Sequence, residues 1–216
     1  MSVVLARPFL VGADPVWLGK SPVDIQHFLA PPPALGSPAD RADLDRILRY
    51  QVSRTEKECE RARSEVSSSL KTFFGPPYGP LTSEEVTKWA PFFEKIHEDE
   101  SAVVRLMKAR WNRPRPYEED PKIAPCVPRA INRAYPSGHT TLARVFAKVL
   151  SRLKPEQAIA FEDRADQIAE DRILGGVHYP TDIQAGKRLG DEIARLLLSD
   201  AAFQKELAGL KAQRNQ

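Results

Sequence analysis

The spacing of apolar residues constrains the fold of this 216-residue chain most strongly. Between about residues 180 and 213, apolar side chains recur every fourth residue, at Ala185, Leu189, Ile193 and Leu197. Side chains at this spacing share one face of an α-helix, whereas a half-buried strand would show alternation. Similar patterns predict further helices over about residues 40–69, 82–96, 99–111, 142–153 and 155–172. We find no convincing strand and no internal repeat, so we expect an all-α, single-domain helical bundle.

The first 40 residues differ from the rest in composition. They are rich in proline and glycine and show no periodicity, as in the stretch APPPALGSPAD. We therefore divide the chain into an extended N-terminal arm, residues 1–40, and a helical domain, residues 41–216. The arm is expected either to be solvated or to lie across the domain. The predicted apolar face of the first helix consists of Leu44, Leu48 and Val52, with Ile47 beside them.

Charge and hydrophobicity exclude several classes of partner. A net charge of +3 gives no reason to propose binding to nucleic acid or to an acidic membrane. No apolar run approaches the roughly 20 residues that a bilayer span requires. The N-terminal stretch is not interpreted as a signal peptide, because Arg7, Pro8 and Asp14 interrupt its apolar patches. Either the protein is cytoplasmic or a signal has been removed from this sequence.

Two cysteines are too few for a disulfide scaffold. Cys59 and Cys126 would pair in an oxidising compartment, but we favour buried free thiols or one buried and one exposed thiol. The sequence has no CxxC or HExxH pattern, so we do not expect a structural zinc site.

The run Pro136-Ser137-Gly138-His139 has the features of a helix start that binds an anion. Ser137 is suited to cap the helix that follows, and Gly138 removes side-chain bulk at its mouth. The first N–H groups of a helix lack intrahelical partners and attract phosphate. His139 would lie within reach of such a ligand. Taken alone, however, this run is more often a capped helix with an incidental histidine.

Two other segments carry residues suited to the same chemistry. In KARWNRPRP, Lys108 and Arg115 can direct two cations at one point, although such residues are usually solvated. In DRILGGVHYPTD, Arg172 precedes a Gly-Gly turn, and His178 and Asp182 lie one helical turn apart. The alternative here is an ordinary acidic residue at a helix start beside a loop histidine.

Together the three segments have the composition that phosphoryl transfer requires. Three cations would neutralise the phosphoryl oxygens, one histidine would attack phosphorus, and the other would protonate the departing oxygen. A carboxylate at 182 would hold one imidazole nitrogen of the attacking histidine and leave the other free.

The order and spacing of these residues resemble the three-part signature of the type 2 phosphatidic acid phosphatase superfamily. That group contains the bacterial class A nonspecific acid phosphatases, membrane lipid phosphatases and vanadium haloperoxidases. Within it, FLAPPPALGS, YPSGHT and SDAAFQKEL are most similar to the class A acid phosphatases, and the resemblance covers about residues 27–212.

The resemblance implies a role for each matching residue. His178 would be the nucleophile that forms a phosphohistidine, Asp182 would orient it, and His139 would be the general acid. The residues implied to bind the phosphoryl oxygens are Lys108, Arg115, Ser137, Gly138 and Arg172. No metal and no other cofactor is implied. The helical bundle would be of the class A acid phosphatase and vanadium haloperoxidase type.

Three positions depart from the family pattern or leave its register open. Asp171 stands where the family usually has serine, and a carboxylate there is expected to weaken anion binding or to lower the optimal pH. Arg133 and Ala134 stand where class A members usually carry Gly-Ser. RPRPY also permits a register with Arg113 at the phosphate, but we keep Arg115 because it alone has the six-residue spacing from Lys108.

The expected protein is therefore a metal-independent acid phosphatase of small phosphate monoesters. Phosphate or vanadate would inhibit it, a homo-oligomer is possible, and the resemblance suggests a bacterial periplasmic location with a cytoplasmic one still open. A vanadate-dependent haloperoxidase on the same scaffold is the first alternative. A non-catalytic helical module that binds phosphate or a partner protein is the second. A membrane lipid phosphatase is disfavoured by the lack of apolar spans.

Overall fold

The computed structural model describes residues 16–18 and 27–214, and all regular secondary structure in these ranges is helical. This confirms the predicted all-α fold. A single 3₁₀ turn, η1 (Pro155–Gln157), lies between two of the α-helices. The α-helices are α2 (Pro38–Ser53), α3 (Glu56–Ser64), α4 (Leu70–Phe74), α5 (Ser83–Trp111), α6 (Pro116–Glu119), α7 (Gly138–Leu153), α8 (Ala158–Leu174), α9 (Pro180–Ser199) and α10 (Ala201–Arg214).

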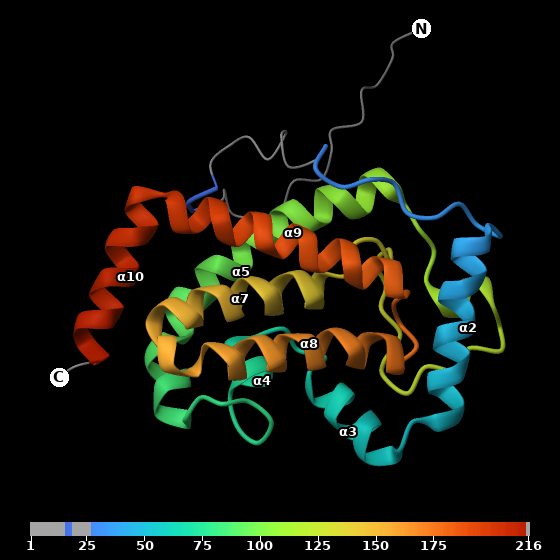
Figure 1. Ribbon diagram of the computed structural model, residues 1–216, viewed down its shortest axis with the longest axis horizontal. Helices are drawn as coiled ribbons and strands as arrows, with labels where there is room; N and C mark the ends of the chain where they lie inside the picture. Colours follow the sequence, from blue (N-terminus) through green and yellow to red (C-terminus); the bar gives the residue numbers. More distant parts are fainter. Residues whose placement is uncertain (1–15, 19–26, 215–216) are drawn as a thin grey trace, which may run out of the picture.

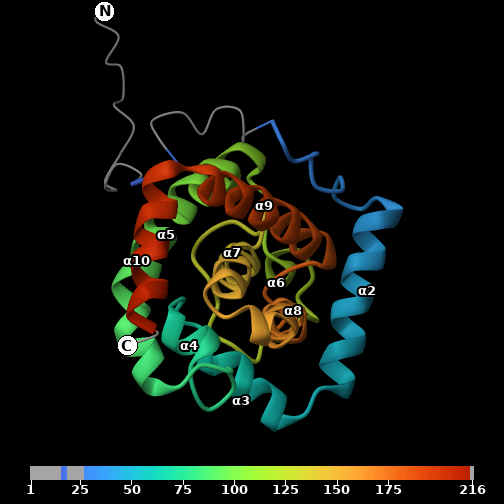
Figure 2. The same ribbon diagram turned by 60° about the vertical axis from the view of Figure 1, so that its left-hand side comes forward.

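Helix α7 lies at the centre of the bundle and is seen almost end-on in Figure 2. It packs mainly against α8 and α9, which run beside it in both views, while α2 and α10 lie on opposite sides of the molecule (Figure 1). Within the described ranges, no helix is both long and apolar enough to cross a membrane.

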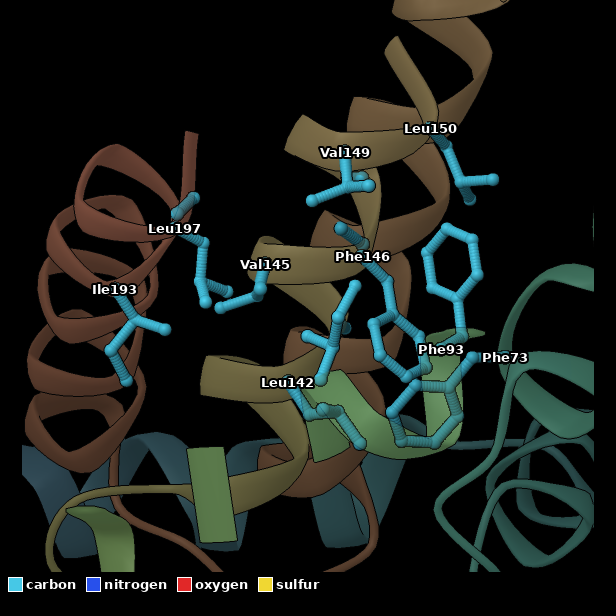
Figure 3. Close-up of a cluster of buried hydrophobic side chains, with 14 of the residues drawn as sticks. Phe73, Phe93, Leu142, Val145, Phe146, Val149, Leu150, Ile193 and Leu197 are labelled. Carbon is cyan, nitrogen blue, oxygen red and sulfur yellow. The ribbon is translucent and has the colours of Figure 1, made fainter. Parts of the chain in front are cut away.

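The core forms around the apolar residues of α7 (Figure 3). Phe146 packs edge-on against Phe93 of α5 at 5.0 Å between ring centroids, and it also contacts Phe73 of α4. Val145 lies toward Leu197 of α9. The predicted faces of α7 and α9 are confirmed, since all of their members are buried: Leu142, Phe146, Val149, Leu153, Ala185, Leu189, Ile193 and Leu197.

The predicted helix over residues 40–69 is instead two helices, α2 and α3. The chain breaks at Arg54, and Thr55 caps α3 by accepting a hydrogen bond from the Glu58 N–H while the Glu58 carboxylate accepts one from the Thr55 N–H. Val52, predicted to be on the apolar face, is 88 % exposed, whereas Ile47 is buried. The cap at Thr55 starts a new helix, although the apolar periodicity of the sequence predicts one continuous helix.

The two helices predicted over 82–96 and 99–111 form one 29-residue helix, α5, with Pro91 inside it. Proline in a helix interior removes one hydrogen bond. Burial of the apolar side chains on either side, among them Trp89, Phe92 and Phe93, compensates for that loss. One face of α5 thereby runs without interruption from the core to Lys108.

The described parts of the N-terminal arm contact the domain. The backbone N–H groups of Val16, Trp17 and Leu18 donate to the buried carboxylate of Asp99 on α5. The Trp17 ring packs against Phe203 at 5.0 Å between centroids. Residues 1–15, which carry most of the stretch considered as a signal peptide, lie outside the described residues.

Cys59 of α3 and Cys126 form a disulfide, so the expectation of free thiols was wrong. Their Cα atoms are 5.8 Å apart although 67 positions separate them in the sequence. The loop around Cys126 is also held by Arg54 and Arg63, which donate to the carbonyls of Ala124 and Cys126. The segment between α6 and α7 is thereby fixed against α3.

Candidate active site

Six of the eight residues that the sequence assigned to the site line one cavity of about 340 Å³. They are Lys108, Arg115, Gly138, His139, Arg172 and His178. The other two, Ser137 and Asp182, are fully buried and do not line it. The cavity lies where the ends of α5, α7 and α8 meet, so three segments distant in sequence converge there.

The N-terminus of α7 forms one wall of the cavity. Ser137 caps this helix as predicted, because its Oγ accepts from the N–H and from the hydroxyl of Thr140, the latter at 2.9 Å. Its hydroxyl is thus used within the helix cap. Gly138 and His139 occupy the first turn, where backbone N–H groups lack intrahelical acceptors, and both line the cavity. This end of α7 is suited to an anion.

The turn between α8 and α9 brings Arg172 and His178 to the same cavity. Gly176 has φ of +77°, a left-handed conformation that side-chain-bearing residues rarely adopt. The chain then folds back, and the N–H groups of Val177 and His178 both donate to the carbonyl of Arg172 at 3.2 Å. The Gly-Gly turn predicted from the sequence is therefore what positions His178.

His178 and Asp182 form a buried pair at the start of α9. The His178 Nδ1 lies 3.0 Å from Asp182 Oδ2, which also accepts from the N–H of Tyr179 at 3.0 Å. Burial lowers the pKa of His178 well below its usual value, and the neighbouring Arg115 lowers it further. Burial raises the pKa of Asp182 to about 6, against the opposing effect of Arg113. At neutral pH the pair is a neutral imidazole beside a carboxylate.

This protonation state fixes the tautomer of His178. Its Nδ1 donates to Asp182, so Nε2 carries the lone pair. Nε2 lies 2.8 Å from Nη1 of Arg115, which donates to it. The nitrogen able to attack an electrophile therefore lies on the cavity side of the ring, next to a cation.

Arg115, rather than Arg113, lines the cavity. It is held by the carbonyls of Val177 and Asn132 at 2.7 and 2.8 Å. Arg113 does not line the cavity and instead pairs with three buried carboxylates: Asp40, Asp43 and Asp182. The sequence leaves Arg113 open as a competing phosphate ligand and does not show this positioning role, because two of its partners lie about 70 residues earlier.

Lys108 is buried at the end of α5. Its Nζ donates to the carbonyls of Arg133 and Ala134, so the residues that depart from the family pattern contribute backbone oxygens here. Burial lowers the pKa of Lys108 to about 7, and repulsion from Arg115 acts in the same direction. An anion in the cavity would restore its positive charge.

Arg172 supplies the third cation. Its Nε is buried without a hydrogen-bond partner among the described residues, and its Nη1 donates to the carbonyl of Ala62 at 3.3 Å. Burial lowers the pKa of Arg172 to about 10, so it stays charged at neutral pH. The neighbouring Asp171 does not line the cavity; two 2.7 Å hydrogen bonds pair it with Arg61 of α3. The negative charge of Asp171 is therefore neutralised by Arg61, outside the cavity.

His139 lies in the first turn of α7 and lines the same cavity as His178. Its Nε2 donates to the carbonyl of Glu65 at 3.1 Å, and its ring packs 5.7 Å from the Phe73 centroid. Burial lowers the pKa of His139 well below its usual value, with a contribution from Arg172. A bound phosphate would favour its protonated form by adding negative charge.

The cavity also contains residues that sequence reasoning missed, among them Ser68, His97, Glu100 and Asn132. Glu100 lies two turns before Lys108 on the same helix, a spacing that could have signalled a shared face. In the described part of the chain, no group of three or more histidine, cysteine or acidic residues is placed to hold a metal ion.

No family model matches this chain. A non-specific acid phosphatase of Salmonella typhi is 28% identical over 204 residues, which covers 89% of this chain and 81% of the relative.

Solved structures with lower identity have the same fold. A bacterial vanadium-dependent iodoperoxidase aligns with a TM-score of 0.58 and 18% identity, over 77% of this chain and 51% of that one. A transmembrane PAP2-type phosphatidylglycerolphosphate phosphatase from Bacillus subtilis aligns with a TM-score of 0.56 and 19% identity, over 75% and 86%. At these identities the likeness concerns the fold alone.

Proposed function

Because this chain belongs to the type 2 phosphatidic acid phosphatase superfamily and is a phosphoric monoester hydrolase, we propose that it acts through a phosphohistidine intermediate and without a metal ion. The observation that carries the proposal is that one cavity is lined by the two histidines and the three cations of the motifs: His139, His178, Lys108, Arg115 and Arg172. A tetrahedral dianion would be surrounded by charge and by the first turn of α7.

The first step forms a bond between His178 and phosphorus. The lone pair on Nε2 attacks, and the bond from phosphorus to the ester oxygen breaks in line with it. Asp182 stabilises the positive charge that develops on the ring through its contact with Nδ1. His139 gives its proton to the departing oxygen, so the alcohol leaves neutral.

The second step returns the enzyme to its starting state. Water attacks the phosphohistidine, and the phosphorus–nitrogen bond breaks. The neutral His139 accepts the proton of that water. Phosphate leaves, and the lone pair returns to Nε2 of His178. Lys108, Arg115 and Arg172 stabilise the charge on the phosphoryl oxygens in both steps.

The test of this proposal is His178→Ala, assayed with p-nitrophenyl phosphate. We expect turnover to fall by at least about a thousandfold, because removal of a covalent nucleophile leaves only binding and charge stabilisation. In the wild type, rapid quenching with radiolabelled substrate should trap an acid-labile label on His178. His27→Ala, an exposed histidine outside the cavity, is the matched control. Activity in His178→Ala equal to that of the control would refute the mechanism.

Metal independence has its own test. Dialysis against EDTA is expected to leave kcat unchanged, because the proposed nucleophile and charge stabilisation come from side chains. Addition of Mg²⁺ or Zn²⁺ to the dialysed protein should not raise the rate. Activity that disappears on chelation and returns with metal would contradict this part of the proposal.

We also propose a periplasmic location. The disulfide between Cys59 and Cys126 supports it, because such bonds persist in oxidising compartments and are rare in the cytosol.

A further inference from the structure

One face of α5 forms a continuous wall of the cavity. The residues it contributes are alternately three positions and one position apart: His97, Glu100, Ser101, Val104, Arg105 and Lys108. Lys108 stands at the end of this wall where the three cations converge. At a rise of about 1.5 Å per residue, Glu100 lies about 12 Å along the helix axis from Lys108. The wall thus leads away from the anion site.

Glu100 is a buried carboxyl group whose hydrogen bonding is incomplete. Its residue is 2 % exposed, and its Oε1 has no hydrogen-bond partner among residues 16–18 and 27–214. Its Oε2 accepts from Ser101 Oγ at 3.4 Å, a long contact. A buried polar atom without a partner is costly, and it calls for a ligand or a water molecule as the missing partner.

Burial raises the pKa of Glu100 to about 8; Lys108, Ser101 and Arg105 act against this rise. Below that pH the group is protonated, so it can both donate and accept a hydrogen bond. A neutral carboxyl also avoids repelling an anionic substrate. A hydroxyl group, which likewise donates and accepts, is the natural complement to it.

The following step rests on the proposed function. With the phosphoryl group held by Lys108, Arg115 and Arg172, the organic part of the substrate must extend into the rest of the same cavity. The apolar side chains of Val104 and Leu142 line it, and Glu100 and Ser101 lie farther along the α5 wall. A ring-sized alcohol would present its far substituents to these two polar side chains.

We propose that Glu100, together with Ser101, binds hydroxyl groups of the leaving alcohol and so selects phosphate monoesters of polyhydroxylated alcohols. The class of substrate favoured is a sugar-like polyol phosphate, over an apolar alcohol phosphate of the same size. Glu100 is a specificity-determining residue in this scheme, and it takes no part in the bond-breaking steps.

The experiment compares glucose 6-phosphate with cyclohexylmethyl phosphate, which has a ring of similar size without hydroxyl groups. The readout is the ratio of their kcat/KM values in the wild type and in Glu100→Met, which replaces the carboxyl by an apolar group of similar length. We expect Glu100→Met to lower this ratio about 3- to 10-fold, the effect of losing one hydrogen bond. Glu100→Gln, which keeps a donor and an acceptor, should restore most of the ratio.

Glu98→Gln, an exposed substitution on the same helix, is the matched control and should leave the ratio unchanged. Equal changes for both substrates in Glu100→Met would mean that Glu100 has only a structural role, and would overturn the inference. If the wild type hydrolysed neither ester, the proposed function would fail as well. If the wild type hydrolyses both esters and Glu100→Met leaves the ratio of their kcat/KM values unchanged, the inference is wrong while the proposed function stands.

Discussion

At the scale of single residues, the two histidines differ in what holds them. His178 is fixed by a carboxylate on Nδ1 and a guanidinium beside Nε2. His139 is held by a backbone carbonyl, which binds its Nε2 without adding a full charge. The first environment suits a nucleophile whose developing charge needs stabilisation. The second leaves the proton affinity of His139 to be set by the bound anion.

This difference predicts how His139→Ala behaves. We expect kcat for alkyl phosphates to fall about 10²- to 10⁴-fold, because their alkoxide leaving groups need a proton. The loss for p-nitrophenyl phosphate should be much smaller, since p-nitrophenolate leaves without one. The measurement is the slope of log kcat against leaving-group pKa, with His27→Ala as the control. An equal loss for every leaving group would argue against a general-acid role.

At the scale of elements, α3 holds several of the residues in and around the site in place. It supplies the carbonyl of Ala62 to Arg172, the side chain of Arg61 to Asp171, and the disulfide to the loop that precedes α7. The residue after α3, Glu65, supplies the carbonyl that holds His139. A nine-residue helix too short to be stable alone is thus fixed by its tertiary contacts.

Cys59→Ser is expected to destabilise the folded protein by about 2–4 kcal/mol, because the disulfide restricts a long loop in the unfolded chain. The measurement is the urea midpoint of unfolding. Reduction of the wild type should lower the midpoint by a similar amount. The same reductant should have no effect on the double variant Cys59→Ser/Cys126→Ser. A wild-type midpoint that does not respond to reduction would contradict this expectation.

At the scale of the whole molecule, the fold buries charge around its active site. Several charged groups lie inside a small helical bundle: Arg113 with its three carboxylates, Glu100, and the buried cavity cations Lys108, Arg115 and Arg172. Removing such groups from water is unfavourable, so stability is expected to depend on the pH at which they carry charge. Glu100 gives the clearest case, because within residues 16–18 and 27–214 its carboxyl forms no ion pair with a cationic side chain.

The sign of this dependence follows from the raised pKa. Between about pH 4.5 and pH 8 the carboxyl of Glu100 is protonated in the folded protein and ionised in the unfolded one. Folding stability is therefore lost as pH rises through this window, by at most about 1.4 kcal/mol per pH unit. Glu100→Gln should become increasingly stabilising, relative to wild type, from pH 4.5 to pH 8.

Urea unfolding of wild type and Glu100→Gln at several pH values measures the difference. Glu98→Gln, exposed on the same helix, serves as the control. A stability difference between wild type and Glu100→Gln that does not vary with pH would show that Glu100 is not buried as described.

The sequence by itself determined the helical class, the buried faces of α7 and α9, the cap at Ser137 and the three segments that meet at the cavity. These features depend on residues close together in the chain or on a specific order of motifs. The spacing of apolar residues could not show that the first predicted helix breaks at Arg54. The break depends on Thr55, whose side chain caps a new helix instead of continuing the first one.

Only the tertiary structure decided which contacts form between distant segments. It paired Cys59 with Cys126, turned Arg113 toward three acids while Arg115 faced the cavity, and directed Asp171 to Arg61. It also buried Glu100 in the wall of the cavity that holds the anion site. The physical reason is that charge pairing and burial depend on distances in space, and the packing of α5, α7 and α8 around one core sets those distances.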